Sequence, residues 1–197
     1  AMGDLGTDTA VTEVGDGRYT AEVSRDWEIW GPMGGYVASL ALRAAGAEAG
    51  GKRPTSFSCH YFAAARFEPV DIRVEVRKPG RVAEAYRVEI EQHGRRVLDA
   101  MVWATEEVEG LEHDETAPPD VPGPEGLPSV EELAGPDSAP PFPFWENFDS
   151  RPLDFISPWP PSEPFPAAWC DCLRFTPAAR FSDPWIDACR SVILIDL

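Results

Sequence analysis

Apolar residues recur at helical spacing directly after a glycine-rich turn at residues 31–35. The spacing i, i+3, i+4, i+7, i+8 marks one face of a helix, and the remaining positions are mostly alanine, serine and leucine. A helix that is apolar on nearly all sides is normally buried. Gly46 and the pair Gly50-Gly51 predict where it ends. The residues on the periodic face are Met33, Tyr36, Val37, Leu40, Ala41 and Ala44.

Alternating apolar and polar residues predict an antiparallel meander that wraps this helix. The clearest case is residues 70–77, where every second residue is valine or isoleucine and charged residues lie between them. Residues 97–105 are apolar on both faces, which is typical of a central strand. The first part of the chain is therefore predicted to have an α+β fold. The expected strands cover residues 12–23 (two strands joined by a turn), 55–62, 70–77, 82–91 and 97–105.

The chain changes character between residues 106 and 166. This stretch holds 15 of the 21 prolines and few periodic apolar runs, which is typical of a linker. Aromatic residues gather at 140–145 and 155–159. A fully solvated linker would not carry so many aromatics, so we expect its second half to lie extended against the folded surface and its first half to be mobile.

The negative charge of the chain is concentrated in the same region. The formal net charge is −17, and between residues 97 and 150 there is no lysine or arginine against 14 aspartates and glutamates. An acidic protein is poorly suited to bind nucleic acid, so nucleic-acid partners are excluded. The remainder of the chain is close to neutral.

The chain carries no pattern for membrane insertion, secretion or metal binding. No run of 18 apolar residues occurs, so we expect no membrane span, and the absence of a leader predicts a cytoplasmic protein. The four cysteines lack zinc-ligand spacing, and His60, His93 and His113 are scattered. We therefore expect no metal and no cofactor.

Residues 169–175 and 185–197 repeat the order of the first unit, with a strand, a turn and an apolar helix. Ser182 or Asp183 is a suitable helix cap, and Pro184 suits the first helical turn. No strands follow this helix, so either the chain continues or another chain supplies them. The predicted division is a complete N-terminal unit (1–107), an acidic proline-rich linker (108–166) and the start of a second unit (167–197).

Several short motifs occur in a fixed order along the chain. They are Trp30-Gly31-Pro32 before Gly34-Gly35, the strand at 56–62, the turn at 77–81, the strand and turn at 87–94, and then Trp169, Arg174 and 193–196. This ordered set resembles the double-hotdog acyl-CoA thioesterases of the acyl-CoA thioesterase II-like family. A hotdog is a long helix wrapped by an antiparallel sheet. The resemblance implies one complete hotdog, a linker and the beginning of a second hotdog.

The resemblance also implies an activity. Members of this family hydrolyse acyl-CoA thioesters in fatty acid metabolism, at sites where two hotdogs meet. The acyl thioester runs between the units, and an activated water attacks its carbonyl. Because each hotdog leaves a sheet edge and a helix face uncovered, we expect a homo-oligomer, a dimer or higher.

Asp196 is the candidate base for thioester hydrolysis. The reaction needs a base for water and donors for the developing oxyanion. Asp196 follows Cys189 and Val192 at helical spacing on an apolar face, where a carboxylate is a candidate for a perturbed pKa. The resemblance places it where related enzymes keep a catalytic aspartate; the alternative is a solvated residue near the end of the sequence. The family's Thr or Ser and its Gln lie beyond Leu197, so this chain alone is expected to be inactive.

Four further residues are candidates for substrate binding. Gly34 and Gly35 offer N–H groups at a helix N-terminus, where the dipole favours negative charge; alternatively, the glycines let the helix start close to a strand. Tyr36 adjoins this turn, although packing is its simpler role. His60 lies on the strand face opposite Phe57, and a structural role remains the alternative.

Two other functions remain open. A hotdog hydratase or dehydratase needs an acid paired with a histidine on the hotdog helix, and neither predicted helix contains a histidine. A non-catalytic module that binds acyl-CoA, or that assembles with a partner chain, is the other alternative.

Overall fold

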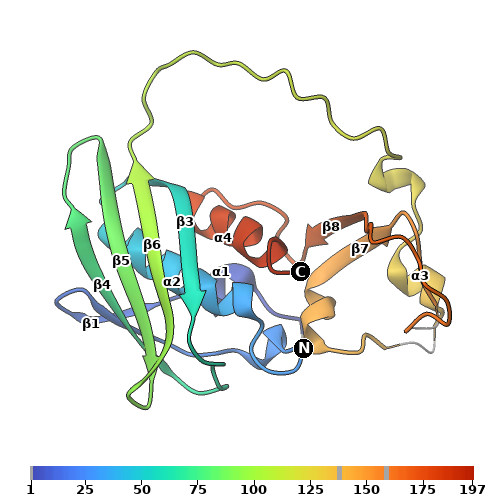
Figure 1. The fold of residues 1–197 in the computed structure, drawn as a ribbon, viewed down its shortest axis with the longest axis horizontal. Helices are drawn as coiled ribbons and strands as arrows, with labels where there is room; N and C mark the ends of the chain where they lie inside the picture. The colour runs from blue at the N-terminus through green and yellow to red at the C-terminus, as the bar shows by residue number, and fades with distance from the viewer. Residues whose placement is uncertain (1, 137–138, 158–159) are drawn as a thin grey trace.

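The computed structural model describes residues 2–136, 139–157 and 160–197 (Figure 1). Six antiparallel strands form one sheet in the order β1-β2-β4-β5-β6-β3, and β7 pairs with β8 in a second, two-stranded sheet. The helices are α1 (Leu5–Asp8), α2 (Gly34–Glu48), α3 (Val130–Ala134) and α4 (Pro184–Leu194), with 3-10 turns η1 (Arg25–Trp27), η2 (Pro124–Gly126) and η3 (Pro143–Asn147). The strands are β1 (Thr12–Gly15), β2 (Arg18–Ala21), β3 (Arg53–Tyr61), β4 (Val70–Lys78), β5 (Ala83–Gln92), β6 (Arg95–Thr105), β7 (Phe148–Pro152) and β8 (Asp171–Phe175).

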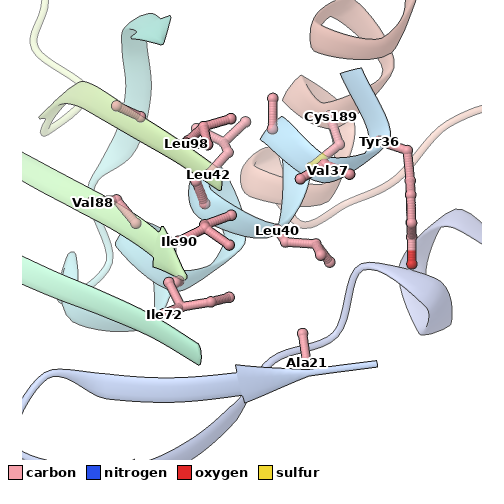
Figure 2. Packing of buried hydrophobic residues seen from close by; sticks show 14 of the residues in the cluster. Ala21, Tyr36, Val37, Leu40, Leu42, Ile72, Val88, Ile90, Leu98 and Cys189 are labelled. Atoms are coloured by element: carbon pink, nitrogen blue, oxygen red, sulfur yellow. The ribbon is translucent and has the colours of Figure 1, made fainter. Parts of the chain in front are cut away.

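The main core lies between the large sheet and helix α2. Alternate residues of β4, β5 and β6 point toward α2, and Figure 2 shows Ile72, Val88, Ile90 and Leu98 facing the leucines of the helix. The predicted meander and its wrapped helix are thus confirmed. Val76 is an exception, because the β4–β5 register shifts beside it and leaves its side chain exposed.

Helix α2 runs through Gly46 and ends at Glu48, just before Gly50 and Gly51, which have positive φ angles. Of the two predicted stop signals, the glycine pair marks the end of the helix and Gly46 does not. Gly46 serves close packing instead: a Cβ there would lie 2.6 Å from two ring carbons of Trp185 on α4. The glycine therefore lets a second helix approach α2.

Helix α4 lies beside α2 on the same face of the sheet (Figure 1). Asp183 caps it, with Oδ1 accepting a hydrogen bond from the Trp185 N–H at 2.8 Å. The sequence predicted that this helix would end at Leu197, but it ends at Leu194. Asp196 is thus in the turn that follows α4, where its N–H donates to the Ile193 carbonyl at 3.2 Å.

The predicted linker is partly folded. Residues 106–123 form no helix or strand and run as a long arch from β6 toward α3 (Figure 1). Beyond α3, however, β7 pairs with β8, and the predicted strand at 169–175 begins only at Asp171. Phe144 and Phe148 are buried against Trp27, with ring centroids 6.1 and 6.4 Å from it.

Asn147 links this second half of the segment to the N-terminal part of the chain by hydrogen bonds. Its side chain is fully buried; Nδ2 donates to the Asp26 carbonyl at 2.8 Å, and Oδ1 accepts from the Gly3 N–H at 2.7 Å. The Phe144 N–H also donates to the Glu28 carbonyl at 3.1 Å. Residues 143–152 are therefore part of the folded body.

Within the described ranges, no helix is long and apolar enough to cross a membrane.

Candidate functional site

The carboxylate of Asp196 meets the first turn of α2. Its Oδ2 accepts a hydrogen bond from the Gly35 N–H at 2.8 Å, at a helix end where the backbone dipoles favour a negative charge. The contact joins residues 161 positions apart. It brings the end of the sequence to the glycine-rich turn from which α2 starts.

Gly34 and Gly35 make this contact possible because neither has a side chain. A Cβ on Gly34 would lie 2.6 Å from Asp196 Oδ2, and a Cβ on Gly35 would lie 2.7 Å from the Val192 carbonyl oxygen. Both glycines therefore permit a close approach, as the alternative interpretation held, but the atoms that approach most closely belong to the end of α4. The Gly35 N–H does bind a negative charge, and that charge is the protein's own carboxylate.

A hollow of about 180 Å³ opens beside Asp196. It lies between α2, the edge strand β3 and the end of α4, and most of its surface is apolar. Its mostly apolar lining with one carboxylate is typical of a small-molecule site. The lining residues are Ala38, Phe57, Ser58, Cys59, Tyr61, Val192, Ile195 and Asp196.

Two titratable side chains of β3 share this hollow with Asp196. Burial raises the pKa of the Tyr61 phenol, and the neighbouring Cys59 and Asp196 raise it further. Burial also raises the pKa of the Cys59 thiol, to which the Asp196 charge adds. Both groups are therefore protonated at neutral pH, and Cys59 is not an activated thiolate. The site combines a carboxylate, a neutral hydroxyl and an apolar wall.

Tyr36 lies apart from this arrangement despite its place in the sequence. Its ring is fully buried and stacks on Trp27 with a centroid distance of 5.4 Å. Its hydroxyl donates to the Asp8 carbonyl at 2.8 Å and accepts from the Ser24 N–H at 3.0 Å. Figure 2 shows the side chain pointing toward the N-terminal segment. The structure thus gives Tyr36 a packing role and no access to a substrate in the hollow.

His60 is also separated from Asp196. It is exposed on the outer face of the sheet, paired in register with Asp99 of β6, whereas Cys59 and Tyr61 face the hollow. The alternation of strand side chains explains the separation. Of the four candidate binding residues, the structure brings only Gly34 and Gly35 to Asp196.

The candidates that sequence reasoning missed are Cys59 and Tyr61. Their signal was visible, since Phe57, Cys59 and Tyr61 alternate on the inward face of one strand. What the alternation does not reveal is that β3 is an edge strand and that Asp196 comes to lie beside its end. Among the residues the structure describes, no group of three or more His, Cys, Asp or Glu side chains is placed to hold a metal ion.

Comparisons with known proteins agree with this architecture. Residues 23–105 match the family described as the acyl-CoA thioesterase N-terminal domain. A candidate thioesterase II from Thermobifida fusca YX is 25% identical, with a TM-score of 0.65, and the match covers 77% of this chain and 55% of that one. The chain thus spans about half the length of that protein. No protein of curated function matches the chain in sequence.

More distant structures show the fold. The tesB protein of Mycobacterium avium subspecies paratuberculosis is 20% identical with a TM-score of 0.74, covering 100% of this chain and 69% of that one. A hot dog protein of unknown function from Alicyclobacillus acidocaldarius is 18% identical with a TM-score of 0.75, covering 98% and 72%. The chain therefore has a hotdog fold, as the sequence predicted.

Proposed function

We propose that the protein hydrolyses acyl-CoA thioesters with a water activated by Asp196, and the match of residues 23–105 to the family described as the acyl-CoA thioesterase N-terminal domain supports this proposal. The observation that carries the proposal is the Asp196 carboxylate, held by the Gly35 N–H at 2.8 Å beside an apolar hollow. A carboxylate fixed in this way has the position and polarity of a general base.

The chemistry needs neither a metal nor a covalent intermediate. Gly35 holds Oδ2, and Oδ1 takes the proton from a water that attacks the thioester carbonyl carbon. The tetrahedral intermediate then expels the CoA sulfur, which takes that proton and leaves as the free thiol. The fatty acyl chain lies in the hollow against Ala38, Phe57 and Val192, where burial of its methylene groups favours binding.

The end of the chain acts as the start of a second hotdog in this proposal. Helix α4 lies against α2 and carries Asp196 just beyond its C-terminus, so the site lies where two units meet. The strands that complete the second unit come from further residues or from another copy of the chain. A homo-oligomer follows in the second case.

A hydratase or dehydratase fits the site less well. That chemistry needs a histidine beside the acid, and none of the residues that line the hollow is a histidine. The outward position of His60 removes the one candidate close to the site in sequence.

Asp196→Asn tests the proposal. The assay measures thiol release from acyl-CoAs of several chain lengths, with the 197-residue chain and with the full product of its gene. Because a general base contributes about 10²- to 10⁴-fold to a rate, we expect kcat to fall by that factor. The matched control is Asp187→Asn. It changes an aspartate on helix α4 that pairs with Arg190, and we expect turnover to stay unchanged.

Two outcomes contradict the proposal. A folded full-length product that releases no thiol from any acyl-CoA refutes the activity. Equal kcat values for the wild type and Asp196→Asn refute the assignment of Asp196 as the general base. Light scattering on the same samples reports the oligomeric state and decides between the two sources of the missing strands.

A further inference from the structure

Tyr61 ends the edge strand β3 at the mouth of the hollow. It faces the same side of the strand as Phe57 and Cys59, and 47% of its surface is exposed. The side chain is thus within reach of a ligand that enters from solvent, while its ring rests against the protein. This accessibility distinguishes it from the buried Tyr36.

The Tyr61 hydroxyl and the Asp196 carboxylate face the same point above Gly34. A Cβ built on Gly34 would lie 2.6 Å from Asp196 Oδ2 and 3.3 Å from the Tyr61 oxygen. Because glycine has no Cβ, nothing of its own stands between the two oxygens. The two oxygens therefore lie near each other on the same side of Gly34, at the edge of the hollow that both residues line.

The two oxygens have complementary chemistry. Burial, the Cys59 thiol and the Asp196 charge all raise the pKa of Tyr61, so its hydroxyl keeps its proton and remains a hydrogen-bond donor. Asp196 is an acceptor. One group can therefore take a proton from water while the other stabilises the oxygen on which negative charge develops.

The site needs such a donor from a side chain. The Gly35 N–H, which would otherwise face an oxyanion at the helix N-terminus, is committed to Asp196 Oδ2 at 2.8 Å. The Cys59 thiol is at most a weak donor. Tyr61 is a lining residue whose hydroxyl is protonated and lies near Asp196 and Cys59, 3.3 Å from the position of a Cβ on Gly34.

We propose that Tyr61 is a catalytic residue whose hydroxyl donates a hydrogen bond to the carbonyl oxygen of the bound acyl thioester. The inference rests on the proposed function and adds the oxyanion donor to it. The water oxygen bonds to the carbonyl carbon, its proton passes to Asp196, and the carbonyl π electrons move onto the oxygen that Tyr61 contacts. When the carbon–sulfur bond breaks, the CoA sulfur receives the proton held by Asp196, and Tyr61 returns to its starting state.

Tyr61→Phe removes the donor and keeps the ring. Loss of one oxyanion donor typically lowers kcat by about 10²- to 10³-fold, and we expect that loss with little change in KM. The matched control is Tyr19→Phe, since the Tyr19 hydroxyl donates to Glu48 at 2.6 Å, at the other end of α2. A thermal unfolding midpoint measured for both variants separates loss of catalysis from loss of fold.

A second readout does not depend on turnover. In a ketone analogue of acyl-CoA, a methylene replaces the sulfur, so the ligand cannot be hydrolysed and keeps its carbonyl. With a ¹³C label at that carbonyl, difference infrared spectroscopy reports hydrogen bonding as a shift of the C=O stretch to lower frequency. We expect the shift in the wild type and in Tyr19→Phe, and its loss in Tyr61→Phe.

The outcomes separate the two proposals. If acyl-CoA is not hydrolysed but the carbonyl shift depends on Tyr61, hydrolysis is refuted, while the hydrogen bond from Tyr61 to the bound carbonyl stands. If the wild type and Tyr61→Phe give the same carbonyl frequency, or if the analogue does not bind, the assignment is overturned. Equal kcat values for the wild type and Tyr61→Phe overturn it as well.

Discussion

Gly46→Ala is a substitution for which the sequence and the structure predict opposite signs. Gly46 lies inside α2, and replacing an interior helical glycine by alanine ordinarily stabilises a helix by about 1 kcal/mol. In the structure, the new Cβ would lie 2.6 Å from Cγ and Cδ2 of Trp185 and 3.1 Å from its Cβ. These are rigid atoms next to the backbone of α4, not the far end of a flexible side chain.

Trp185 has little freedom to move away from such a clash. Its side chain is nearly buried, and its Nε1–H donates to the Lys52 carbonyl at 2.8 Å. Overpacking costs about 2 kcal/mol, and a strained or lost hydrogen bond adds about 1 kcal/mol. Against the helical gain of about 1 kcal/mol, the net expectation is a loss of about 2 kcal/mol. For a chain of this size that lowers the unfolding midpoint by roughly 4–8 °C.

Thermal unfolding followed by circular dichroism measures this loss. Gly31→Ala is the matched control, because nothing lies within 4 Å of a Cβ at that position. A double-mutant cycle with Trp185→Ala identifies the cause. Once the indole is gone, Gly46→Ala should become stabilising by about 1 kcal/mol. A rise in the midpoint for Gly46→Ala in the wild-type background would refute this reasoning.

Two further predictions concern the stability of the body around the site. Asn147→Ala should lower the free energy of unfolding in urea by about 2–5 kcal/mol, because it strands the buried Gly3 N–H and Asp26 carbonyl; a loss below about 0.5 kcal/mol contradicts it. The Arg87 guanidinium lowers the pKa of Asp99, so this ion pair stabilises the fold above the unfolded pKa of about 3.9 and is lost as the pH falls through the lower folded pKa. Asp99→Asn should therefore lower the unfolding midpoint at pH 7, and this loss should shrink as the pH falls below about 3.9; a pH-independent difference contradicts this.

Local periodicity was enough to predict the large sheet and helix α2. The strands are buried on one face and the helix is buried on nearly all sides, so each leaves a clear pattern in the sequence. In β4, Ile72 and Val74 alternate with charged residues, and few structures other than a half-buried strand produce this pattern. Gly46 was wrongly predicted as a stop signal because it is required for close packing against Trp185, a partner 139 positions later that local spacing cannot show. A glycine required for packing and one required for a turn look alike in a sequence.

Strand β7 was hidden for a related reason. Phe148, Ser150 and Pro152 are buried at alternate positions, yet they lie in a stretch whose prolines and acidic residues are typical of a linker. Their burial depends on pairing with β8 and on the rings around Trp27, which are distant contacts.

The candidate site was predicted in part. Asp196 was predicted as the base from the resemblance and from its spacing; the structure places it just beyond the helix rather than on it, and its role stays a prediction. Tyr36 was favoured by its position next to the glycines, but a helix turns each successive side chain by about 100°, and its ring faces the N-terminal segment. Tyr61 requires knowledge of which strand lies at the edge of the sheet, and that is a property of the topology.

Because α4 is synthesised after α2, the packing of α4 on α2 also affects how the chain folds during translation. Synthesis completes β6 at Thr105 long before α4 begins at Pro184, and at about 5–20 residues per second the interval lasts roughly 4–16 s. Throughout that time the small-residue side of α2 around Gly35 and Gly46 remains uncovered on the nascent chain. The acidic residues of the arch emerge during the same interval, and their like charge keeps neighbouring nascent chains apart until the covering helix arrives.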